Sequence, residues 1–203
     1  MDGRVAIVTG ASRGIGRHIA ERLAAEGAAV ALVARTVTEG SSPLPGSLEE
    51  AVETINSRGG RAAAIPADLT APADVETIVE RARAALGPVD TLVNNAGVNF
   101  YGPALGLPPR RYEVMYQIMV HTPFRLAQLA IPGMVERGRG WIVNITSKQA
   151  RHPLGRPTRS GPATGAWPTG CARRRSTGSP PGSRRSCTAP GSASTRSGPR
   201  VLS

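Results

Sequence analysis

The stretch VAIVTGASRGIG, residues 5–16, decides the fold of this chain. Its first part, residues 5–8, is a compact apolar run that is long enough for a buried strand. Three glycines follow, and apolar residues then recur at helical spacing over 15–23. The stretch therefore predicts a strand, a tight glycine turn and an amphipathic helix, in that order.

Each glycine of this turn has a task of its own. Gly10 permits the tight strand-to-helix turn, Gly14 removes a side chain where the backbone approaches a pyrophosphate, and Gly16 lets helix and strand pack closely. The N-terminus of the following helix offers free N–H groups and a partial positive charge to phosphates. Glycine also makes ordinary turns, but a strand–turn–helix context favours a dinucleotide-binding loop.

Short apolar runs and amphipathic stretches alternate as far as residue 157. Further strands are expected at 30–33, 63–66, 89–93 and 141–145. A long helical pattern runs from Pro109 to about Glu136, and Pro123 and Pro132 should kink or break it. Alternating units of this length predict an α/β fold, in which helices cover both faces of a parallel sheet.

The charge of the 203 residues, formally +11, is distributed unevenly. Residues 1–136 carry 14 acidic residues and 12 arginines, a net charge of −2, whereas residues 137–203 carry 12 arginines, one lysine and no acid. Residues 158–203 are rich in Ser, Arg, Gly, Thr and Pro, a composition that cannot bury enough apolar surface to offset its ordering entropy. We therefore predict a folded domain over 1–157 and a disordered basic tail over 158–203.

Several protein classes do not fit this sequence. Two cysteines, Cys171 and Cys187, do not make a disulfide framework. No apolar run approaches the ~18–20 residues that span a bilayer, and the N-terminal residues lack the pattern of a secretory signal. We expect a cytoplasmic protein with no membrane partner and no metal site.

The glycine pattern, together with Asn94-Asn95-Ala96-Gly97 after the fourth strand, resembles the short-chain dehydrogenase/reductase family. The resemblance covers residues 3 to about 157. It includes Asp68-Leu69, which in that family lies beside the adenine ring, and residues 142–147, which resemble a fifth strand ending in the catalytic serine, here Ser147. It implies a Rossmann-type, doubly wound parallel sheet that binds NAD or NADP and transfers hydride to or from a small carbonyl or alcohol substrate. The cofactor-binding residues that it implies are Gly10, Ser12, Arg13, Gly14, Ile15, Gly16, Arg35, Asp68, Leu69, Asn95, Ala96 and Gly97.

The end of the second strand distinguishes the two cofactors. An acidic residue there would hold the ribose hydroxyls of NAD and repel a 2′-phosphate. This chain instead has Ala34-Arg35-Thr36, and Arg35 can meet a phosphate with two parallel hydrogen bonds, with Arg13 placed to help. NADP is therefore favoured and NAD is the second choice; the alternative is that both arginines are solvated surface charges.

The catalytic set that the resemblance implies is incomplete. The family uses a serine, a tyrosine acid or base, a lysine four residues after that tyrosine, and an asparagine on the long helix. Ser147 fits the first role, but all three tyrosines precede it, and the sole lysine, Lys148, directly follows it. The asparagine position falls at Met119, and His121 lies within the alignment error, although an ordinary helix histidine is the alternative. We expect hydride transfer to be impaired.

Two other functions compete with an impaired oxidoreductase. One is a non-catalytic dinucleotide-binding protein. The other is nucleic-acid binding through Arg173–Arg175 and Arg184-Arg185, whose affinity would fall steeply with salt. The tail has one aromatic residue, Trp167, so base stacking is not supported and an accidental charge run is favoured.

We hypothesise that the tail is an out-of-frame translation of a family-like ending, which makes the chain a frameshifted remnant. The composition changes where the tyrosine unit should begin, and arginine outnumbers lysine 24 to 1, as GC-rich codons would give. The coding DNA tests the idea, because a Tyr-x-x-x-Lys unit should then appear in another frame. With its last strands missing, the sheet should keep an open edge, and the apolar stripe that the family's homo-oligomers cover should be exposed.

Overall fold

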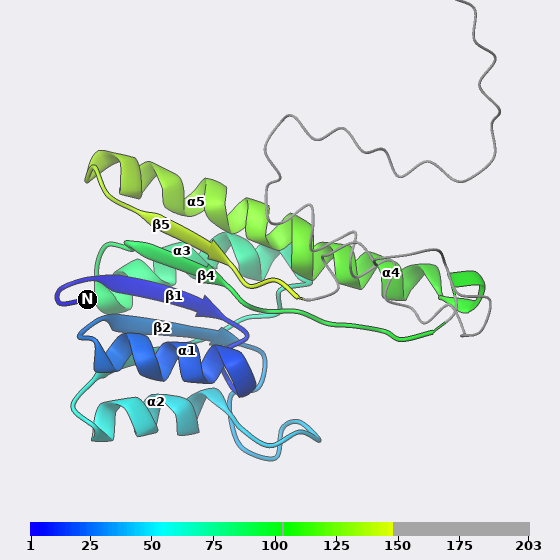
Figure 1. Ribbon diagram of the computed structural model, residues 1–203, viewed down its shortest axis with the longest axis horizontal. Coiled ribbons are helices and arrows are strands. Elements are labelled where there is room, and N and C mark those ends of the chain that lie inside the picture. The colour runs from blue at the N-terminus through cyan, green and yellow to red at the C-terminus, as the bar shows by residue number, and fades with distance from the viewer. Residues whose placement is uncertain (103, 148–203) are drawn as a thin grey trace, which may run out of the picture.

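The computed structural model describes residues 1–102 and 104–147, so the predicted tail over 158–203 lies outside the described residues. Figure 1 shows strands and helices alternating along the chain. The strands are β1 (Val5–Thr9), β2 (Ala29–Ala34), β3 (Arg61–Pro66), β4 (Thr91–Asn94) and β5 (Trp141–Asn144). The α-helices are α1 (Gly14–Ala25), α2 (Leu48–Ser57), α3 (Pro72–Leu86), α4 (Pro109–Tyr116) and α5 (Thr122–Glu136). A 3₁₀ turn, η1 (Ala104–Gly106), precedes α4, and a π-helical segment, η2 (Gln117–His121), joins α4 to α5.

The five strands form one parallel sheet in the order β3-β2-β1-β4-β5. Every residue of β1 and β2 is buried, as expected for strands that are covered on both faces. The strand order reverses between β1 and β4, and ligands of such sheets bind outside the carboxyl ends of the strands at this switch point. The predicted α/β fold is confirmed, and it brings the glycine turn after β1 next to the segment that follows β4.

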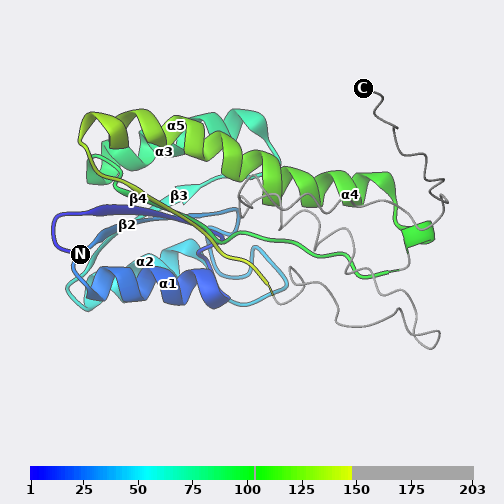
Figure 2. The ribbon, with the colours of Figure 1, turned by 45° about the horizontal axis from the view of Figure 1, so that its top comes forward.

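Helices cover both faces of the sheet, and Figure 2 shows the sheet between them, with α3 and α5 on one side and α1 and α2 on the other. Side chains alternate between the two faces along each strand. Ile7 and Leu92 belong to the core under α3 and α5. Val8 and Val93 belong to the core over α1 and α2. None of the helices within residues 1–102 and 104–147 has the length and apolar character needed to cross a bilayer.

The long helical pattern over 109–136 is realised without a break, but not as one uniform α-helix. Pro123 has no N–H to offer the preceding turn, and η2 lies directly before it, where the wider π turn accommodates the missing hydrogen bond. Pro132 lies inside α5 and the helix continues to Glu136, so of the two outcomes predicted there, a kink or a break, the break does not occur. Leu126, Ala130 and Met134 hold this part of α5 on the sheet, and their burial outweighs the loss of one hydrogen bond.

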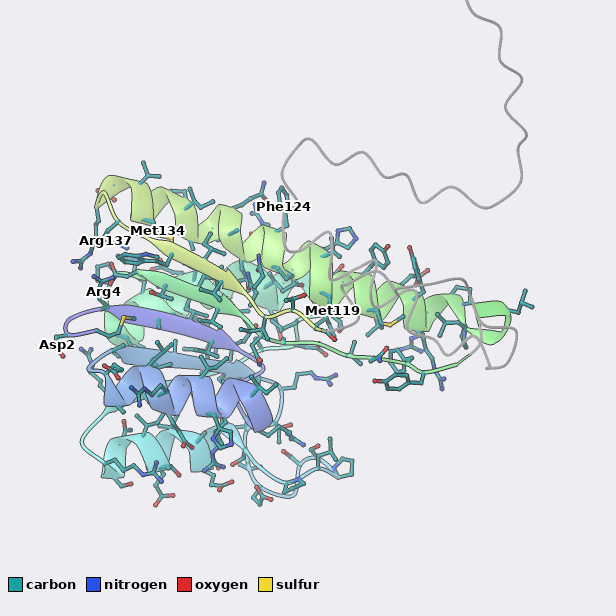
Figure 3. The ribbon with its side chains drawn as sticks, in the orientation of Figure 1. Asp2, Arg4, Met119, Phe124, Met134 and Arg137 are labelled. Carbon is teal, nitrogen blue, oxygen red and sulfur yellow. The ribbon has the colours of Figure 1, made fainter. Side chains whose placement is uncertain are left out.

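Strand β5 forms the edge of the sheet that the described residues make. Its apolar side chains Trp141, Ile142 and Val143 are 45, 37 and 44% exposed. Phe124 on α5 is also exposed, and Figure 3 shows it projecting from that helix. In the described part of the chain β5 pairs with β4 alone, and Phe124, Ile131 and Val135 of α5 are exposed, whereas Met115 and Leu126 of the predicted helix stripe are buried.

A buried carboxylate, that of Asp90, holds the strands together at the end of the sheet away from the glycine turn. Asp90, 1% exposed, accepts the N–H of Val5 at 3.0 Å and an N–H of Arg139 at 3.1 Å. Arg137, labelled in Figure 3, brings its Nε to 3.6 Å from the same carboxylate. The backbone carbonyl of Asp90 also accepts the N–H of Trp141 at 2.9 Å. One residue thus links β1, β4 and β5 at the end of the sheet away from the glycine turn.

Candidate cofactor site

The glycine turn after β1 is built by the close approach of three backbone segments. Gly10 has a φ of +68°, a conformation that side chains with a Cβ rarely adopt. At Gly16, a Cβ would lie 2.3 Å from the carbonyl oxygen of Gly10 and 2.4 Å from the side-chain nitrogen of Asn95. Helix α1 can therefore begin against the end of β1 only because residue 16 has no side chain.

Gly14 differs from its two neighbours because it faces open space. Its φ is +55°, and a Cβ placed there would meet nothing within 4 Å. Both Gly14 and Ile15 are exposed at the start of α1. The lack of a side chain at this position leaves the backbone open to a ligand outside the protein.

The N-terminus of α1 is free to bind an anion. Arg13 occupies the N-cap position without a side-chain hydrogen bond to the helix, and the first turn contains no acidic residue. The N–H groups of a first turn have no partner within their helix, and they carry the positive end of the helix dipole. This helix end therefore offers hydrogen-bond donors and positive potential beside the open space at Gly14.

Thr9 and Asn95 tie the end of β4 to the turn. The side-chain nitrogen of Asn95 donates to the carbonyl oxygen of Thr9 at 2.9 Å and to that of Gly10 at 3.3 Å. The Thr9 hydroxyl accepts the N–H groups of Asn95 at 3.0 Å and Ala96 at 3.1 Å. The side chain of Asn95 thus holds the turn in place, while Gly97 lies exposed beyond it. Thr9 was missed in the sequence, where its one signal is a polar residue that ends an apolar strand.

The expected adenosine end of the site contains one exposed cation. The side chain of Arg35 is 69% exposed, and its Nη1 lies 3.9 Å from a carboxylate oxygen of Asp68. Leu69 is buried, and its carbonyl oxygen accepts the hydroxyl of Thr122 at 2.7 Å, which joins this corner to α5. The structure therefore brings Arg35 and Asp68 together after β2 and β3.

Asp68 is held in its ionised form. Burial favours the neutral acid, but two hydrogen bonds from Thr70, from its N–H and its hydroxyl, both at 2.8 Å, outweigh that effect. The positive charge of Arg35 adds to them, so the pKa of Asp68 is lower than that of an ordinary aspartate. Arg35 and Asp68 therefore face each other with opposite charges at neutral pH.

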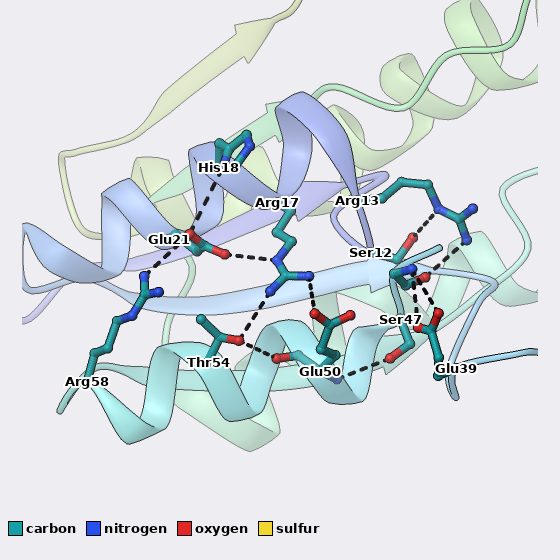
Figure 4. A network of polar contacts seen from close by, with 11 residues as sticks. Ser12, Arg13, Arg17, His18, Glu21, Glu39, Ser47, Glu50, Thr54 and Arg58 are labelled. Carbon is teal, nitrogen blue, oxygen red and sulfur yellow. Dashed lines mark hydrogen bonds and ion pairs between the residues drawn. The ribbon is translucent and has the colours of Figure 1, made fainter. Parts of the chain in front are cut away.

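Arg13 turns toward the 36–47 loop, the segment between β2 and α2. Figure 4 shows the side chain of Arg13 extending from the start of α1 toward the side on which Ser47 and Glu39 lie. It donates to hydroxyl and carbonyl oxygens of this loop, and its Nε lies 3.5 Å from the hydroxyl of the buried Ser12. The structure thus places Arg13 beside the predicted phosphate region, with its donors occupied by the protein itself.

The predicted catalytic position lies after β5. Ser147 is half-buried, and residues 145–147 lead away from the strand. A groove of about 320 Å³ opens between the η2–α5 helix and the sheet, and it is lined by Asn94, Val120, His121, Pro123, Phe124, Ala127, Ile142 and Asn144. Asn94 donates to the side-chain oxygen of Asn144 at 2.9 Å, and its own buried Oδ1 has no hydrogen-bond partner among the described residues.

The long helix offers this region no asparagine. Met119 lies in η2, is 3% exposed, and packs in an apolar cluster with Met115, Val98 and Phe100. His121 is exposed and lines the groove beside α5. Within residues 1–102 and 104–147, no group of three or more His, Cys, Asp or Glu side chains could hold a metal ion.

Comparison with known proteins agrees with this geometry. The sequence profile of the short chain dehydrogenases matches residues 4–158. The chain is 33% identical over 147 residues to the ketoacyl reductase HetN of Nostoc sp. (strain PCC 7120), covering 72% of this chain but 48% of HetN. It thus spans about half the length of this relative.

Two solved structures show the same fold. A metagenomic short-chain oxidoreductase in complex with NADP superposes with a TM-score of 0.73 at 31% identity, covering 87% of this chain and 73% of the other. A 7α-hydroxysteroid dehydrogenase complexed with NADH and 7-oxo glycochenodeoxycholic acid gives 0.74 at 30% identity, covering 87% and 62%. Profile, relative and structures agree with the glycine turn and the strand order, and the chain belongs to the short-chain dehydrogenase/reductase family.

Proposed function

We propose that this chain is an NADP-preferring dinucleotide-binding domain of an oxidoreductase that acts on small carbonyl or alcohol substrates, and that its own hydride transfer is impaired. The observation that carries the proposal is the uncapped N-terminus of α1 beside the open face of Gly14. A pyrophosphate fits this place because backbone N–H groups, positive potential and free space coincide there.

The preference for NADP rests on charge at the end of β2. Arg35 follows the strand directly, is largely exposed, and is 3.9 Å from its carboxylate partner, a distance that leaves its donors accessible. Arg13 is a second cation at the same end of the site. In line with this proposal, the metagenomic relative was solved with NADP, whereas the hydroxysteroid dehydrogenase was solved with NADH.

The proposed hydride transfer is limited because the chain lacks the tyrosine that would donate a proton to the substrate oxygen. A bound nicotinamide supplies or accepts a hydride, and the hydroxyl of Ser147 would hold the substrate oxygen by a hydrogen bond. A carbonyl oxygen that gains a hydride also needs a proton, and a tyrosine with a lowered pKa gives it efficiently. No tyrosine follows Ser147 in the sequence, so we expect nucleotide binding without efficient turnover.

Isothermal titration with NADP⁺ and NAD⁺ tests the binding half of the proposal. We expect NADP⁺ to bind more tightly, and Arg35→Ala to weaken NADP⁺ binding about tenfold, because charge-assisted hydrogen bonds contribute roughly 1.5–3 kcal/mol each. NAD⁺ binding should stay unchanged. The matched control is Arg83→Ala, whose guanidinium pairs with Glu80 on the exposed side of α3. Equal affinities for both nucleotides would refute the preference.

NADPH oxidation with a panel of ketones, keto esters and aldehydes tests the catalytic half. We expect a rate near background that Ser147→Ala leaves unchanged, because serine alone supplies no proton. Fast, Ser147-dependent turnover would show that another group replaces the tyrosine. Reading the coding DNA in all three frames tests the proposal that residues 158–203 are a frameshifted ending.

A further inference from the structure

We propose that the 36–47 loop is a built-in competitor for Arg13: it occupies the guanidinium in the nucleotide-free chain, and the 2′-phosphate of NADP must displace it. The inference rests on the proposed cofactor preference and adds a mechanism that sets its strength. NAD has no 2′-phosphate, so its binding leaves the contacts between Arg13 and the loop intact.

The loop provides four acceptors for the guanidinium. Nη2 of Arg13 donates to the hydroxyl of Thr36 at 2.9 Å and to the carbonyl oxygen of Gly46 at 3.1 Å. Nη1 donates to the carbonyl oxygen of Leu44 at 2.8 Å and to the hydroxyl of Ser42 at 3.3 Å. These acceptors come from both ends and the middle of the loop, so Arg13 links the loop to the start of α1.

All four acceptors are neutral. Within the described ranges, Arg13 has no carboxylate partner, and the loop's own acid, Glu39, accepts instead the N–H of Gly46 at 3.2 Å. The guanidinium supplies the only charge in these bonds, whereas a phosphate would add a charged acceptor and can accept two parallel N–H bonds from one arginine. A phosphate that reaches Arg13 therefore offers charged, bidentate acceptors in place of neutral oxygens, and the bonds to the loop that must break lower the net gain in affinity.

The loop is shaped to hold this position. Backbone bonds close its base, from the N–H of Leu48 to the carbonyl of Thr36 at 3.0 Å and from Glu49 to Val37 at 3.1 Å. A Cβ at Gly46 would lie 2.8 Å from the carbonyl oxygen of Ser12, so the loop packs directly on the glycine turn. Compact surface loops with such closed ends are packed by their own side chains, and here Arg13 takes part in that packing. Loss of the Arg13 contacts should therefore loosen the whole segment.

Two adjacent serines supply the variant and its control. The Ser42 hydroxyl accepts from Arg13 and from the N–H of Leu44, both at 3.3 Å, whereas the Ser41 hydroxyl donates only within the loop, to the carbonyl oxygen of Thr38 at 2.6 Å. Each variant therefore removes one bond within the loop, and only Ser42→Ala also removes an Arg13 contact. The bond from Arg13 to Ser42 is long, at 3.3 Å, so we assign it roughly 0.5–1.5 kcal/mol, the range of an ordinary intramolecular hydrogen bond rather than of a short charge-assisted one. We expect Ser42→Ala to lower the Kd for NADP⁺ about two- to fivefold and to leave the Kd for NAD⁺ unchanged, and Ser41→Ala to change neither.

Arg13→Ala tests whether the change in NADP⁺ affinity caused by Ser42→Ala depends on the Arg13 guanidinium. In that background, Ser42→Ala should no longer change NADP⁺ affinity. Hydrogen–deuterium exchange of residues 36–47 gives an independent readout: exchange should rise in nucleotide-free Arg13→Ala, and in the unchanged chain it should rise with NADP⁺ but not with NAD⁺.

Weaker NADP⁺ binding by Ser42→Ala would identify Ser42 as a phosphate ligand. It would refute the proposal that the 36–47 loop competes with the phosphate for Arg13. Equal effects of the two serine variants, or slower loop exchange with NADP⁺, would overturn it as well. Failure of both nucleotides to bind would instead refute the proposed function. The two failures are distinguishable, because loop exchange in nucleotide-free Arg13→Ala is measured without any nucleotide.

Discussion

Gly14 and Gly16 lie two residues apart in the glycine turn, and the structure gives them different physical roles. A side chain at Gly16 would enter occupied space, whereas one at Gly14 would enter open space in a backbone conformation that disfavours it. The same substitution at the two positions should therefore separate the stability of the fold from the binding of the nucleotide.

Gly16→Ala should lower the free energy of unfolding by roughly 1–3 kcal/mol, the cost of overpacking, and should reduce NADP⁺ affinity as well. Gly14→Ala should cost about 1 kcal/mol of stability through its positive φ and should reduce NADP⁺ affinity more than its stability loss explains. Urea unfolding and titration calorimetry measure both quantities. Gly102→Ala is the control, because a Cβ there meets nothing within 4 Å and no positive φ is involved.

Asp68 gives the fold a dependence on acid pH. Because its folded-state pKa is lower than its unfolded value of about 3.9, the ionised group stabilises the fold above that value, and the contribution disappears as pH falls through the folded pKa. Thr70→Val removes the hydroxyl bond but keeps the N–H bond, so it should raise the pKa of Asp68 part of the way. Carboxyl ¹³C NMR titration measures this shift, and an unchanged pKa would contradict the assigned cause.

For single residues, the sequence predicts the roles of the glycines but not the hydrogen-bond partners of Asn95 and Arg13. Glycine roles follow from spacing, because the backbone geometry of a strand–turn–helix unit is nearly fixed. The partners of Asn95 and Arg13 do not follow from spacing, because they lie on segments far apart in the sequence. Both residues were predicted at the cofactor site, and both use their side-chain donors on the protein; their contact with a nucleotide stays a prediction.

At the scale of elements, the open edge at β5 is the feature with the clearest consequence. Within the described residues β5 pairs only with β4, and an edge strand with exposed apolar side chains is a template for association with other chains. Val143→Lys places a charge on this edge, where the side chain is 44% exposed. We expect slower concentration-dependent aggregation in light scattering, with a melting temperature close to that of the unchanged chain.

Ala73→Lys is the control for the Val143 variant, because residue 73 is exposed in the first turn of α3, away from the edge. Equal aggregation of Val143→Lys and the unchanged chain would show that another surface drives association. A fall in aggregation with both variants would mean that net charge, and not the edge, is responsible.

Most strands and helices could be predicted from the sequence, because the spacing of their apolar residues indicates which face is buried. The predicted strand over 30–33, for example, extends to Ala29–Ala34, since alanines at its ends pair as well as valines. The long helix was less predictable. Proline removes a hydrogen bond at both 123 and 132, but the sequence does not show that a π turn absorbs the first loss and that burial of α5 outweighs the second.

At the scale of the whole molecule, the sheet depends on Asp90. Its carboxylate links β1 to two arginines that precede β5, and it is almost completely buried. Asp90→Ala leaves the buried N–H of Val5 without an acceptor and removes the partner of the half-exposed Arg139, so it should lower the free energy of unfolding by about 1–3 kcal/mol in urea denaturation. Glu80→Ala, which breaks an exposed pair with Arg83, should change stability little. Similar losses for the two variants would contradict the anchoring role of Asp90.

Every residue assigned to the nucleotide lies at or before Gly97, less than halfway along the 203 residues, because the switch point of the sheet uses only the first four strands. During translation, all residues proposed to bind the nucleotide are therefore synthesised before Ser147, the proposed catalytic position. Mutations downstream of Gly97 leave the pocket's own residues unchanged. Changes that abolish hydride transfer can therefore leave the residues proposed to bind the nucleotide in place.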